Sequence, residues 1–453
     1  MIAFSGGMAL ASEVTWVEDP ANPVYDPANH RAYYPCVLYD PSQFSGHGAS
    51  YYYKMWYGGY SSEPGATYNE AVAYSDDGVT WSAPVEMQGI STSGYHAKVV
   101  YVPGGYGAGP FYYKMWYWNG TMTYSINDLR TADSTDGVTW VNDQILTQDA
   151  TYPLVTGVSP DWNRGSYGPV AILYNPTATN TGGNPFDYTF AMYYDGTTGG
   201  LEVIGLGYSA DGNHWTRYGS NPVLDHGNPG DWDSDYATNG TVIPDVNGEW
   251  HMWYSGSGPS GGGNEGIGYA TSPDGINWTR DPYNPQLSKD DGVAWRDVRT
   301  YTPSVLYSAT GFDGHGGDKI LKMWFSGRTN TPSTNYAVGY AERTNIIPVG
   351  PTRKYTTIQS ALDAAFPGDI IEVDPGTYNE QLFVNKALTV RSTSGAASTI
   401  IDGLDTYPYV VRLRTSNIVF DGFTVTNPEY AGGSDASGTV SYTHLTLPTI
   451  LLV

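Results

Sequence analysis

Hydrophobic and polar residues alternate with a period of two along most of the chain, which is typical of β-strands that bury one face. The clearest case is an alternation of Met with aromatic residues that ends at a glycine, and it occurs five times. The five segments read KMWYGG at 54–59, KMWYWNG at 114–120, AMYYDG at 191–196, HMWYSGSG at 251–258 and KMWFSG at 322–327. Each one predicts a buried strand followed by a turn.

Two further segments flank each of these strands, so that the repeat has three parts. A strand that begins with Tyr precedes it, at Tyr33, Tyr95, Tyr167, Tyr236 and Tyr301. In the first four units an Asp-Gly hairpin follows it, and the unit ends at Trp81, Trp140, Trp215 and Trp278. Asp-Gly supplies the positive φ angles of a tight hairpin turn. The units are spaced by 60 to 77 residues, which is near or above the length of a propeller blade.

The fifth unit, which ends with YAVGYAERTN at 336–345, has no Asp-Gly hairpin after it. The missing strand is predicted at the other end of the chain, in SEVTWVEDPANPVY at 12–25. There Trp16 is followed by Asn-Pro-Val, as Trp215 is. We expect this N-terminal strand to complete the last blade, which leaves no sheet edge open. The pattern predicts an all-β chain with a five-bladed β-propeller over 12–345.

The residue composition and the hydrophobic pattern change after a predicted linker at 346–352. Trp disappears, and a capping-box pattern from Thr356 to Gln359 predicts a short helix that ends at Pro367-Gly368. Short Val- and Ile-rich strands with Asp-Gly or Asn turns then follow, at 370–373, 382–384, 388–391, 399–401, 410–413 and 418–425. This predicts a second domain of stacked β-coils over 353–439, which bury their core only against neighbouring coils.

Both parts resemble known carbohydrate-active families. The Ser-x-Asp-Gly-x-x-Trp hairpin, as at 75–81, and the strand order over 12–345 resemble the five-bladed glycosidase superfamily of arabinanases, β-xylosidases and fructosidases. The hairpin is also a variant of the sialidase Asp box, a structural turn with no catalytic role. The helix and strands of 353–439 resemble the first coils of right-handed parallel β-helices of the pectate-lyase and pectinesterase kind. The resemblance implies a glycan-binding propeller with an appended, truncated β-helix.

The two ends of the chain carry signals of their own. Residues 1–11 are apolar and end in Ala-Leu-Ala, which resembles the end of a secretory signal peptide. We therefore expect an exported protein, extracellular or on the cell surface; a wrongly assigned start codon is the alternative. The segment VSYTHLTLPT breaks the pattern and resembles a translated sequencing adapter. Residues 440–453 are thus expected to be an assembly artefact on a fragment, and an apolar natural tail is the alternative.

Composition excludes several classes of protein. The 453 residues include 21 Lys and Arg against 45 Asp and Glu, a formal charge of −24, so a basic nucleic-acid binder is excluded. The same charge favours neutral glycans over polyanions as partners. No apolar run approaches the roughly 20 residues of a membrane helix. The single cysteine, Cys36, is expected in the core, and we expect a monomer. No sequence motif indicates zinc, a phosphate-binding loop or an α/β-hydrolase nucleophile.

A glycan site in the central funnel of a propeller needs aromatic faces and carboxylates. The aromatic candidates are the starts of the five inner strands, which could instead pack between blades. With their proposed hydrogen-bonding and charge partners, the predicted substrate-binding residues are Tyr33, Tyr34, Tyr95, His96, Tyr167, Tyr236, Arg299 and Tyr301.

The family that the chain resembles has Asp on the first two inner strands and Glu on the third. This chain has no acidic residue at these positions. Tyr34, His96 and Gly168 stand at or beside these positions here, so the two-carboxylate mechanism does not transfer. Asp235 and Asp297 lie nearest to inner-strand starts and are the predicted catalytic acids, ahead of Asp161; solvated loop acids are the alternative. Asp231, Asp233 and Asp235 also have oxygen-ligand spacing for Ca²⁺ but lack the other features of an EF-hand, and no other cofactor is expected.

Two functions follow from these observations. The first is a glycosidase-like propeller that engages a polysaccharide or glycan in its funnel and acts as a glycoside hydrolase. The second is a non-catalytic glycan-recognition or cell-surface scaffold module that lacks the acidic triad of the family. Carboxylates facing each other across the funnel distinguish the two.

Overall fold

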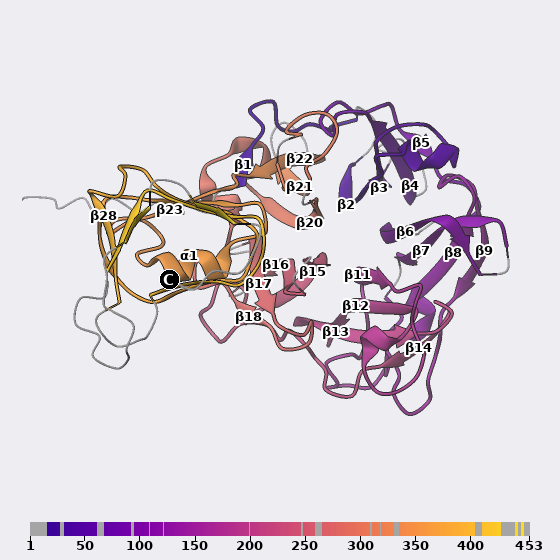
Figure 1. The fold of residues 1–453 in the computed structure, drawn as a ribbon. Coiled ribbons are helices and arrows are strands. Elements are labelled where there is room, and N and C mark those ends of the chain that lie inside the picture. Colours follow the sequence, from indigo (N-terminus) through magenta and orange to yellow (C-terminus); the bar gives the residue numbers. More distant parts are fainter. Residues whose placement is uncertain are drawn as a thin grey trace, which may run out of the picture. The chain divides into compact units, whose positions relative to one another are not determined.

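The protein is described from a computed structural model (Figure 1). The structure describes residues 16–27, 31–60, 68–91, 95–107, 109–120, 122–198, 200–245, 248–258, 265–308, 310–317, 319–329, 335–403, 410–426, 440–442 and 445–447. Contacts divide the chain into two compact units, and each is described by itself. The larger unit contains Val17–Pro244 and Gly248–Glu342; the smaller contains Met1–Trp16, Asp245–Asn247 and Arg343–Val453.

The larger unit is built from antiparallel sheets whose strands follow one another along the chain. One sheet contains β2 (Tyr33–Tyr39), β3 (Tyr53–Tyr60), β4 (Tyr68–Ser75) and β5 (Val85–Glu86). The next contains β6 (Tyr95–Tyr106), β7 (Phe111–Trp118), β8 (Leu129–Ser134) and β9 (Trp140–Ile145). A third contains β20 (Arg299–Tyr307), β21 (Leu321–Thr329), β22 (Asn335–Arg343) and, beside β22, β1 (Trp16–Glu18). The N-terminal strand therefore lies next to the last sheet, where the sequence pattern predicts it.

A ten-stranded sheet holds two further groups of strands. The first group is β11 (Pro169–Tyr174), β12 (Phe190–Thr197), β13 (Glu202–Ser209) and β14 (His214–Arg217), with β10 (Thr147–Gln148) at its edge. The second is β15 (Tyr236–Pro244), β16 (Trp250–Ser257), β17 (Gly266–Ser272), β18 (Thr279–Arg280) and β19 (Leu287–Ser288). One parallel pair, Glu202 with Tyr236, joins the groups. Short 3-10 helices occur at Gln43–Gly46, Ile126–Asp128, Pro185–Asp187, Lys289–Asp291 and Ala294–Arg296.

The first strand of each group contacts the first strand of the next, and these contacts close into a ring. Strand β2 contacts β6, β6 contacts β11, β11 contacts β15, β15 contacts β20, and β20 contacts β2. Figure 1 shows the sheets of this unit arranged around a common centre. The ring brings the N-terminal ends of all five inner strands to one place, which is where the site described below lies.

Aromatic side chains of the Met-aromatic strands link neighbouring sheets through hydrogen bonds to the Asp-Gly turns. The indole Nε1 of Trp56 donates to the carbonyl of Gly137 at 2.8 Å, and the Tyr193 hydroxyl donates to Gly275 at 2.5 Å. Two more links of the same kind join Trp116 to Gly212 and Trp324 to Gly78. The four glycines have φ values between +71° and +85°, as their predicted hairpin turns require. The repeated aromatic residue and the repeated Gly are therefore two halves of one contact.

The smaller unit contains three parallel sheets around an apolar core. Its strands are β23 (Ile346–Val349), β24 (Ile370–Val373), β25 (Gly376–Asn379), β26 (Leu382–Val384), β27 (Thr389–Ser392), β28 (Thr399–Asp402), β29 (Val411–Leu413), β30 (Ile418–Asp421) and β31 (Phe423–Thr426). Strands β23, β24, β27 and β30 form one parallel sheet, β25, β28 and β31 a second, and β26 with β29 a third. Strand β23 lies in the segment predicted as a linker. Strands β32 (Val440–Tyr442) and β33 (Leu445–Leu447) pair antiparallel with β31 and β30, which departs from the parallel pattern of the unit.

The single α-helix of the described residues, α1 (Ile358–Ala364), begins one residue later than predicted. Its N-cap is Thr357, whose side chain accepts from the amide of Ser360, so the predicted capping box from Thr356 to Gln359 is wrong. The reason is Glu380, whose carboxylate accepts from the first two amides of the helix. The predicted all-β class is confirmed by the described residues.

Candidate functional site

A residue with positive φ lies near the start of four inner strands and directly before the fifth, β11. These residues are Tyr34 (55°), His96 (60°), Gly168 (125°), Asn239 (37°) and Thr302 (53°). At or beside each one the register of the sheet shifts, as it does at a β-bulge, which turns a side chain out of its strand. Serine side chains hold two of these bends: Ser326 accepts from the Tyr34 amide at 3.0 Å, and Ser255 from the Thr302 amide at 2.7 Å.

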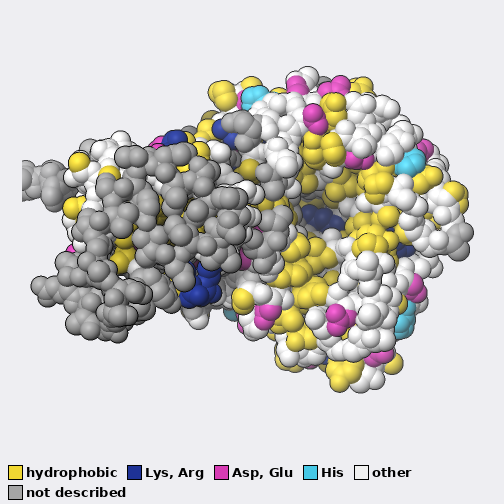
Figure 2. Space-filling model, viewed as in Figure 1, with side chains coloured by type: hydrophobic (Ala, Val, Ile, Leu, Met, Phe, Trp, Pro, Cys, Tyr) yellow, Lys and Arg dark blue, Asp and Glu magenta, His cyan; other side chains and the backbone are white. Residues whose placement is uncertain are grey.

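A cavity of about 180 Å³ opens between the inner strands of the larger unit. The side chains that matter for its chemistry are Tyr34, Glu202, Tyr236, Glu265, Arg299 and Tyr301. The cavity thus combines aromatic walls with two carboxyl groups and one guanidinium group. Figure 2 shows the centre of this unit hollowed on one face, where hydrophobic side chains surround a Lys or Arg and no acidic side chain is in view.

The two carboxyl groups come from equivalent places in the repeat. Glu202 is the first residue of β13 and Glu265 directly precedes β17. Each stands seven residues before the serine of an Asp-Gly hairpin, Ser209 or Ser272. Because the third strand of a unit starts at the same end of the sheet as the inner strand, both side chains reach the cavity.

Burial and charge give the two acids unusual proton affinities. Burial raises the pKa of Glu202 to about 7, with a further contribution from the negative charge of Glu265, while a hydrogen bond from Thr238 and the charge of Arg299 oppose the rise. Burial also raises the pKa of Glu265, and Arg299 opposes it. The Arg299 Nε lies 3.4 Å from Glu265 Oε1. Glu202 is therefore about half protonated at pH 7, whereas the adjacent cation favours the carboxylate form of Glu265.

A third carboxyl group, that of Asp195 on β12, lies behind Glu202 and is fully buried. Its Oδ1 accepts from the backbone amide of Tyr167. Its Oδ2 accepts from the hydroxyl of Thr238 at 3.1 Å. Burial and the nearby Glu202 raise the pKa of Asp195 well above its ordinary value.

A row of aromatic rings includes Tyr34 and Tyr301, which line the cavity. Tyr34 stacks on His96 with 4.5 Å between ring centroids, and it contacts Tyr33 at 4.8 Å and Tyr301 edge-on at 5.9 Å. Tyr33 continues the row to Tyr336 at 4.9 Å. Such flat surfaces suit the apolar faces of sugar rings.

Four of the eight predicted substrate-binding residues line the cavity: Tyr34, Tyr236, Arg299 and Tyr301. Tyr33 and His96 support the wall by ring contacts with Tyr34. The remaining two are placed differently. Tyr167 packs edge-on against Trp118 at 5.2 Å, with its carbonyl 2.6 Å from His96 Nδ1, and Tyr95 lies in β6 with its side chain outside the described residues.

Neither Asp235 nor Asp297 is among the residues that line the cavity. The amide of Asp235 donates to Ser257 in the neighbouring strand. Asp297 is exposed and follows the 3-10 helix Ala294–Arg296. Asp161 lies in a turn, where its backbone bonds to Val158 and Arg164.

Two of the three acids predicted as Ca²⁺ ligands have protein partners in the structure, and the run is not among the groups of possible metal ligands found in the described residues. The side chain of Asp233 is buried and accepts from the Tyr254 hydroxyl at 2.9 Å and from Arg280 Nε at 2.8 Å. Asp231 caps its own turn by accepting from the amide of Asn228. The Ca²⁺ site of Asp231, Asp233 and Asp235 stays a prediction.

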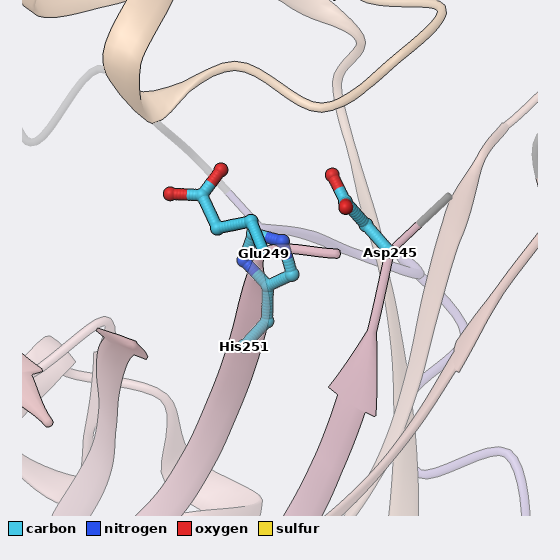
Figure 3. A group of neighbouring side chains, drawn as sticks. All are labelled: Asp245, Glu249 and His251. Atoms are coloured by element: carbon cyan, nitrogen blue, oxygen red, sulfur yellow. The ribbon is translucent and has the colours of Figure 1, made fainter. Parts of the chain in front are cut away.

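Another group of possible metal ligands lies at the hairpin end of β15 and β16 (Figure 3). Asp245, Glu249 and His251 each offer one ligand atom, and these atoms lie within 4.8 Å of one another. The Nδ1 of His251 is 2.8 Å from the Tyr269 hydroxyl. None of the three is among the residues that line the cavity.

Sequence reasoning missed the groups that give the cavity its chemistry, namely Asp195, Glu202, Thr238 and Glu265. The predicted acids lie on loops that precede the inner strands, whereas both glutamates stand at the start of the third strand of a unit. One signal could have found these glutamates, because the third and fourth units both carry Glu at the same distance from the hairpin serine.

No family model matches the chain. Comparison with known proteins therefore shows similar folds but does not assign a family. A cell surface glycoprotein of Methanothermus fervidus is 30% identical over 89 residues, which is 19% of this chain and 14% of that protein. The chain therefore spans a small part of that relative.

The structural neighbours are glycoside hydrolases with propeller-type folds. A solved structure named as a glycoside hydrolase has a TM-score of 0.50 at 16% identity and covers 73% of this chain and 92% of its own. A thermostable family-43 glycoside hydrolase has a TM-score of 0.45 at 17% identity, covering 71% and 91%. An endo-1,4-β-xylanase from Bacteroides thetaiotaomicron has 0.44 at 16%, covering 70% and 91%. At these identities the first likeness shows the fold alone.

Proposed function

We propose that this chain is an exported carbohydrate-active protein that binds a polysaccharide or glycan in its central cavity and hydrolyses its glycosidic bonds. The observation that carries the proposal is the presence of Glu202 and Glu265 in one cavity walled by tyrosines. The propeller-type glycosidase fold of the neighbours is compatible with it. Export is supported by the composition of residues 1–11 and by the similarity to a cell surface glycoprotein.

The proposal includes the finer architecture. The closed ring of five inner strands supports a five-bladed propeller over 12–345. The stacked parallel strands support the first coils of a right-handed parallel β-helix over 353–439. The antiparallel pairing of β32 and β33 is compatible with a foreign origin for 440–453. The segment 346–352 stays the proposed boundary between the domains, although its strand β23 pairs with β24 in the smaller unit.

In the proposed reaction Glu202 is the general acid. Its raised pKa keeps a large fraction of it protonated near pH 7, and the protonated form can give its proton to the glycosidic oxygen as the bond from that oxygen to the anomeric carbon breaks. Glu265, held as a carboxylate by Arg299, takes the second role. It removes a proton from the attacking water in an inverting reaction, or attacks the anomeric carbon itself in a retaining one.

The walls of the cavity account for binding. Tyr34 and Tyr301 offer ring faces, and Tyr236 offers a ring and a hydroxyl to a sugar. Two acids and one cation line the cavity, and the chain carries a formal charge of −24. These charges repel a polyanion, so a neutral glycan is the proposed ligand, bound without a cofactor.

The second function is glycan recognition without catalysis. It is favoured by the residues at the acid positions of the resembled family, which are Tyr34, His96 and Gly168 in this chain. In that case the raised pKa of Glu202 reflects a binding pocket and not a proton donor. The catalytic roles predicted for Asp235 and Asp297 are untested. Neither residue lines the cavity, so the proposal assigns the acid chemistry to the two glutamates.

One experiment separates these functions. The full chain is incubated with a panel of neutral oligosaccharides and aryl glycosides, while binding and product release are followed together. We expect release to fall at least 100-fold in Glu202→Gln and in Glu265→Gln, because each removes one of the two groups that handle protons. Asp297→Asn, at an exposed position, is the matched control and should keep full activity.

The other outcomes are equally informative. Binding without release in the native chain makes the protein a recognition module. Release that survives both glutamine variants but is lost in Asp297→Asn or Asp235→Asn overturns the assignment of the acids and returns it to the loop aspartates.

A further inference from the structure

A second cavity, of about 270 Å³, lies further along the same inner strands than the cavity described above. Of the described residues, none lines both cavities. Every inner strand contributes apolar side chains to its wall, including Val37 from β2, Val99 from β6, Ile172 from β11, Val242 from β15 and Val305 from β20. The second cavity therefore lies beyond the positive-φ residues, toward the C-terminal ends of the inner strands.

Lys98 on β6 is the charged residue of this lining, which contains no acidic side chain among the described residues. Figure 2 shows a hollow of the same composition, with hydrophobic side chains around a Lys or Arg and no acidic side chain in view. The Lys98 Nζ donates to the Gly240 carbonyl of β15 at 2.9 Å. No described carboxyl group forms an ion pair with it. Because an ammonium carries three N–H donors, donors and a positive charge are available to a ligand.

The position of Lys98 in the repeat has a structural role in three other inner strands, and a lysine cannot fill that role. Cys36, Thr241 and Ser304 each stand two residues after the positive-φ residue of their strand, as Lys98 does. Their side chains accept from backbone amides of neighbouring inner strands, at 3.3, 3.1 and 2.9 Å respectively. An ammonium group cannot accept a hydrogen bond. The hydrogen bonding that links the inner strands therefore does not account for a cation here.

We propose that the second cavity binds a small aliphatic carboxylate, whose charged group pairs with Lys98 while its chain packs against the apolar wall. Ligand pockets are mostly apolar with a few placed polar groups, as this one is. An uncharged apolar ligand would leave the ammonium buried without a counter-charge, which is costly. A sugar would turn hydroxyl groups toward aliphatic side chains that offer them no hydrogen bonds. The inference is independent of the proposed function, because it concerns a different cavity.

The polar groups of the second cavity suit a carboxylate. Burial lowers the pKa of Lys98, and the thiol of Cys36 partly opposes this shift. A carboxylate beside the amine favours the ammonium form, so the ligand itself stabilises the charge with which it pairs. Ser304 also lines the cavity, and its hydroxyl, which accepts from the Val37 amide, can still donate its proton. A single ammonium balances one carboxylate, whereas a phosphate dianion needs further cations.

The test is isothermal titration calorimetry of the full chain with octanoate, and with 1-octanol as the uncharged probe of equal chain length. We expect octanoate to bind at least about tenfold more tightly than 1-octanol, because only the carboxylate forms a charge-assisted hydrogen bond with Lys98. Lys98→Met keeps an apolar side chain of similar length, so it should remove this preference and leave the affinity for 1-octanol unchanged. Lys98→Arg is the matched control, which keeps the charge and should keep the preference.

Three results would overturn the proposal. They are no binding of octanoate, octanoate that binds no more tightly than 1-octanol to the native chain, and a preference for octanoate that persists in Lys98→Met. The third result would place the carboxylate elsewhere, for example at Arg299 in the first cavity. Should Lys98→Met fail to fold, the two probes on the native chain still decide the first two points. The titration contains no sugar, so its failure is distinct from failure of the proposed function, which the glycoside screen measures.

Discussion

At the scale of single residues, the larger unit contains a buried acid that the proposed chemistry does not use. Glu70 on β4 is fully buried, and neither of its carboxylate oxygens has a hydrogen-bond partner in the described structure. Burial raises the pKa of Glu70 to about 8. Folding therefore binds a proton that the unfolded chain releases above its ordinary pKa of 4.5, which makes stability depend on pH.

The free energy of unfolding should fall between pH 5 and pH 8 because of Glu70. The contribution of a carboxyl group with a raised pKa is fully present below the unfolded pKa and is lost as pH rises through the folded pKa. At pH 7 the loss is about 3 kcal/mol. Glu70→Gln should remove this slope in denaturant titrations at pH 5 and pH 8, whereas Glu86→Gln, at an exposed position on β5, should leave it. A slope unchanged in Glu70→Gln would refute the assignment.

The side chain of Cys36 links two neighbouring inner strands, β2 and β6, through a hydrogen bond. Its Sγ accepts from the amide of Val99 in the next strand at 3.3 Å, and burial raises the pKa of its thiol. Thr241 accepts from Val305 in the same manner. The buried cysteine expected from the sequence is found, but its role is to satisfy an amide of the neighbouring strand.

At the scale of elements, the repeated Met-aromatic motif both forms a strand and contacts the Asp-Gly turn of the next group of strands. Trp56 of β3 fills the space beside the turn of the next hairpin, where an added Cβ on Gly137 would come within 2.9 Å of the indole. The same indole donates to the Gly137 carbonyl. Periodicity predicts the strands, but it does not show that the motifs of adjacent units meet.

Trp56→Phe should lower the free energy of unfolding by about 1–2 kcal/mol more than Trp81→Phe does. Both changes remove part of a large aromatic surface, but only the first removes a donor and leaves a buried carbonyl without it. Trp81 is the matched control, because its Nε1 is buried without a hydrogen-bond partner in the described structure. Equal losses of stability in chemical denaturation would show that the indole hydrogen bond adds nothing.

At the scale of the whole molecule, the sequence predicts the all-β class, the order of the strands and the place of β1, because periods of two and Asp-Gly turns are local signals. The site is less accessible to such reasoning. Tyr34, Tyr236, Arg299 and Tyr301 follow from the repeat. The acids do not, because whether a strand start reaches the cavity depends on bulges and on packing of sheets that lie far apart in sequence. Glu380 displaces the predicted helix cap for the same reason.

Closure of the ring rests on contacts between the two ends of the larger unit, and these can be tested. Strand β1 pairs with β22, where Asn22 Nδ2 donates to the Tyr340 carbonyl at 2.9 Å and the Tyr340 amide donates to Asn22 Oδ1 at 2.8 Å. Beside them, the buried Arg296 donates from Nε to Glu18 at 3.1 Å. Arg296 also pairs with Asp291 at 3.1 Å, so the loss of Glu18 removes one of two carboxylate partners of a buried cation.

We therefore expect deletion of 1–27 to open the edge of β22 and to leave Arg296 without Glu18. An open edge strand pairs with other chains, so the truncated protein should unfold at a lower temperature and elute as oligomers in size-exclusion chromatography with light scattering. Glu18→Gln, which keeps β1 but removes the charge, should lower stability by about 1–3 kcal/mol without oligomers, because Arg296 keeps its ion pair with Asp291. Deletion of 1–11 is the control. A truncated chain as stable as that control would mean that the remaining strands hold the ring closed without β1.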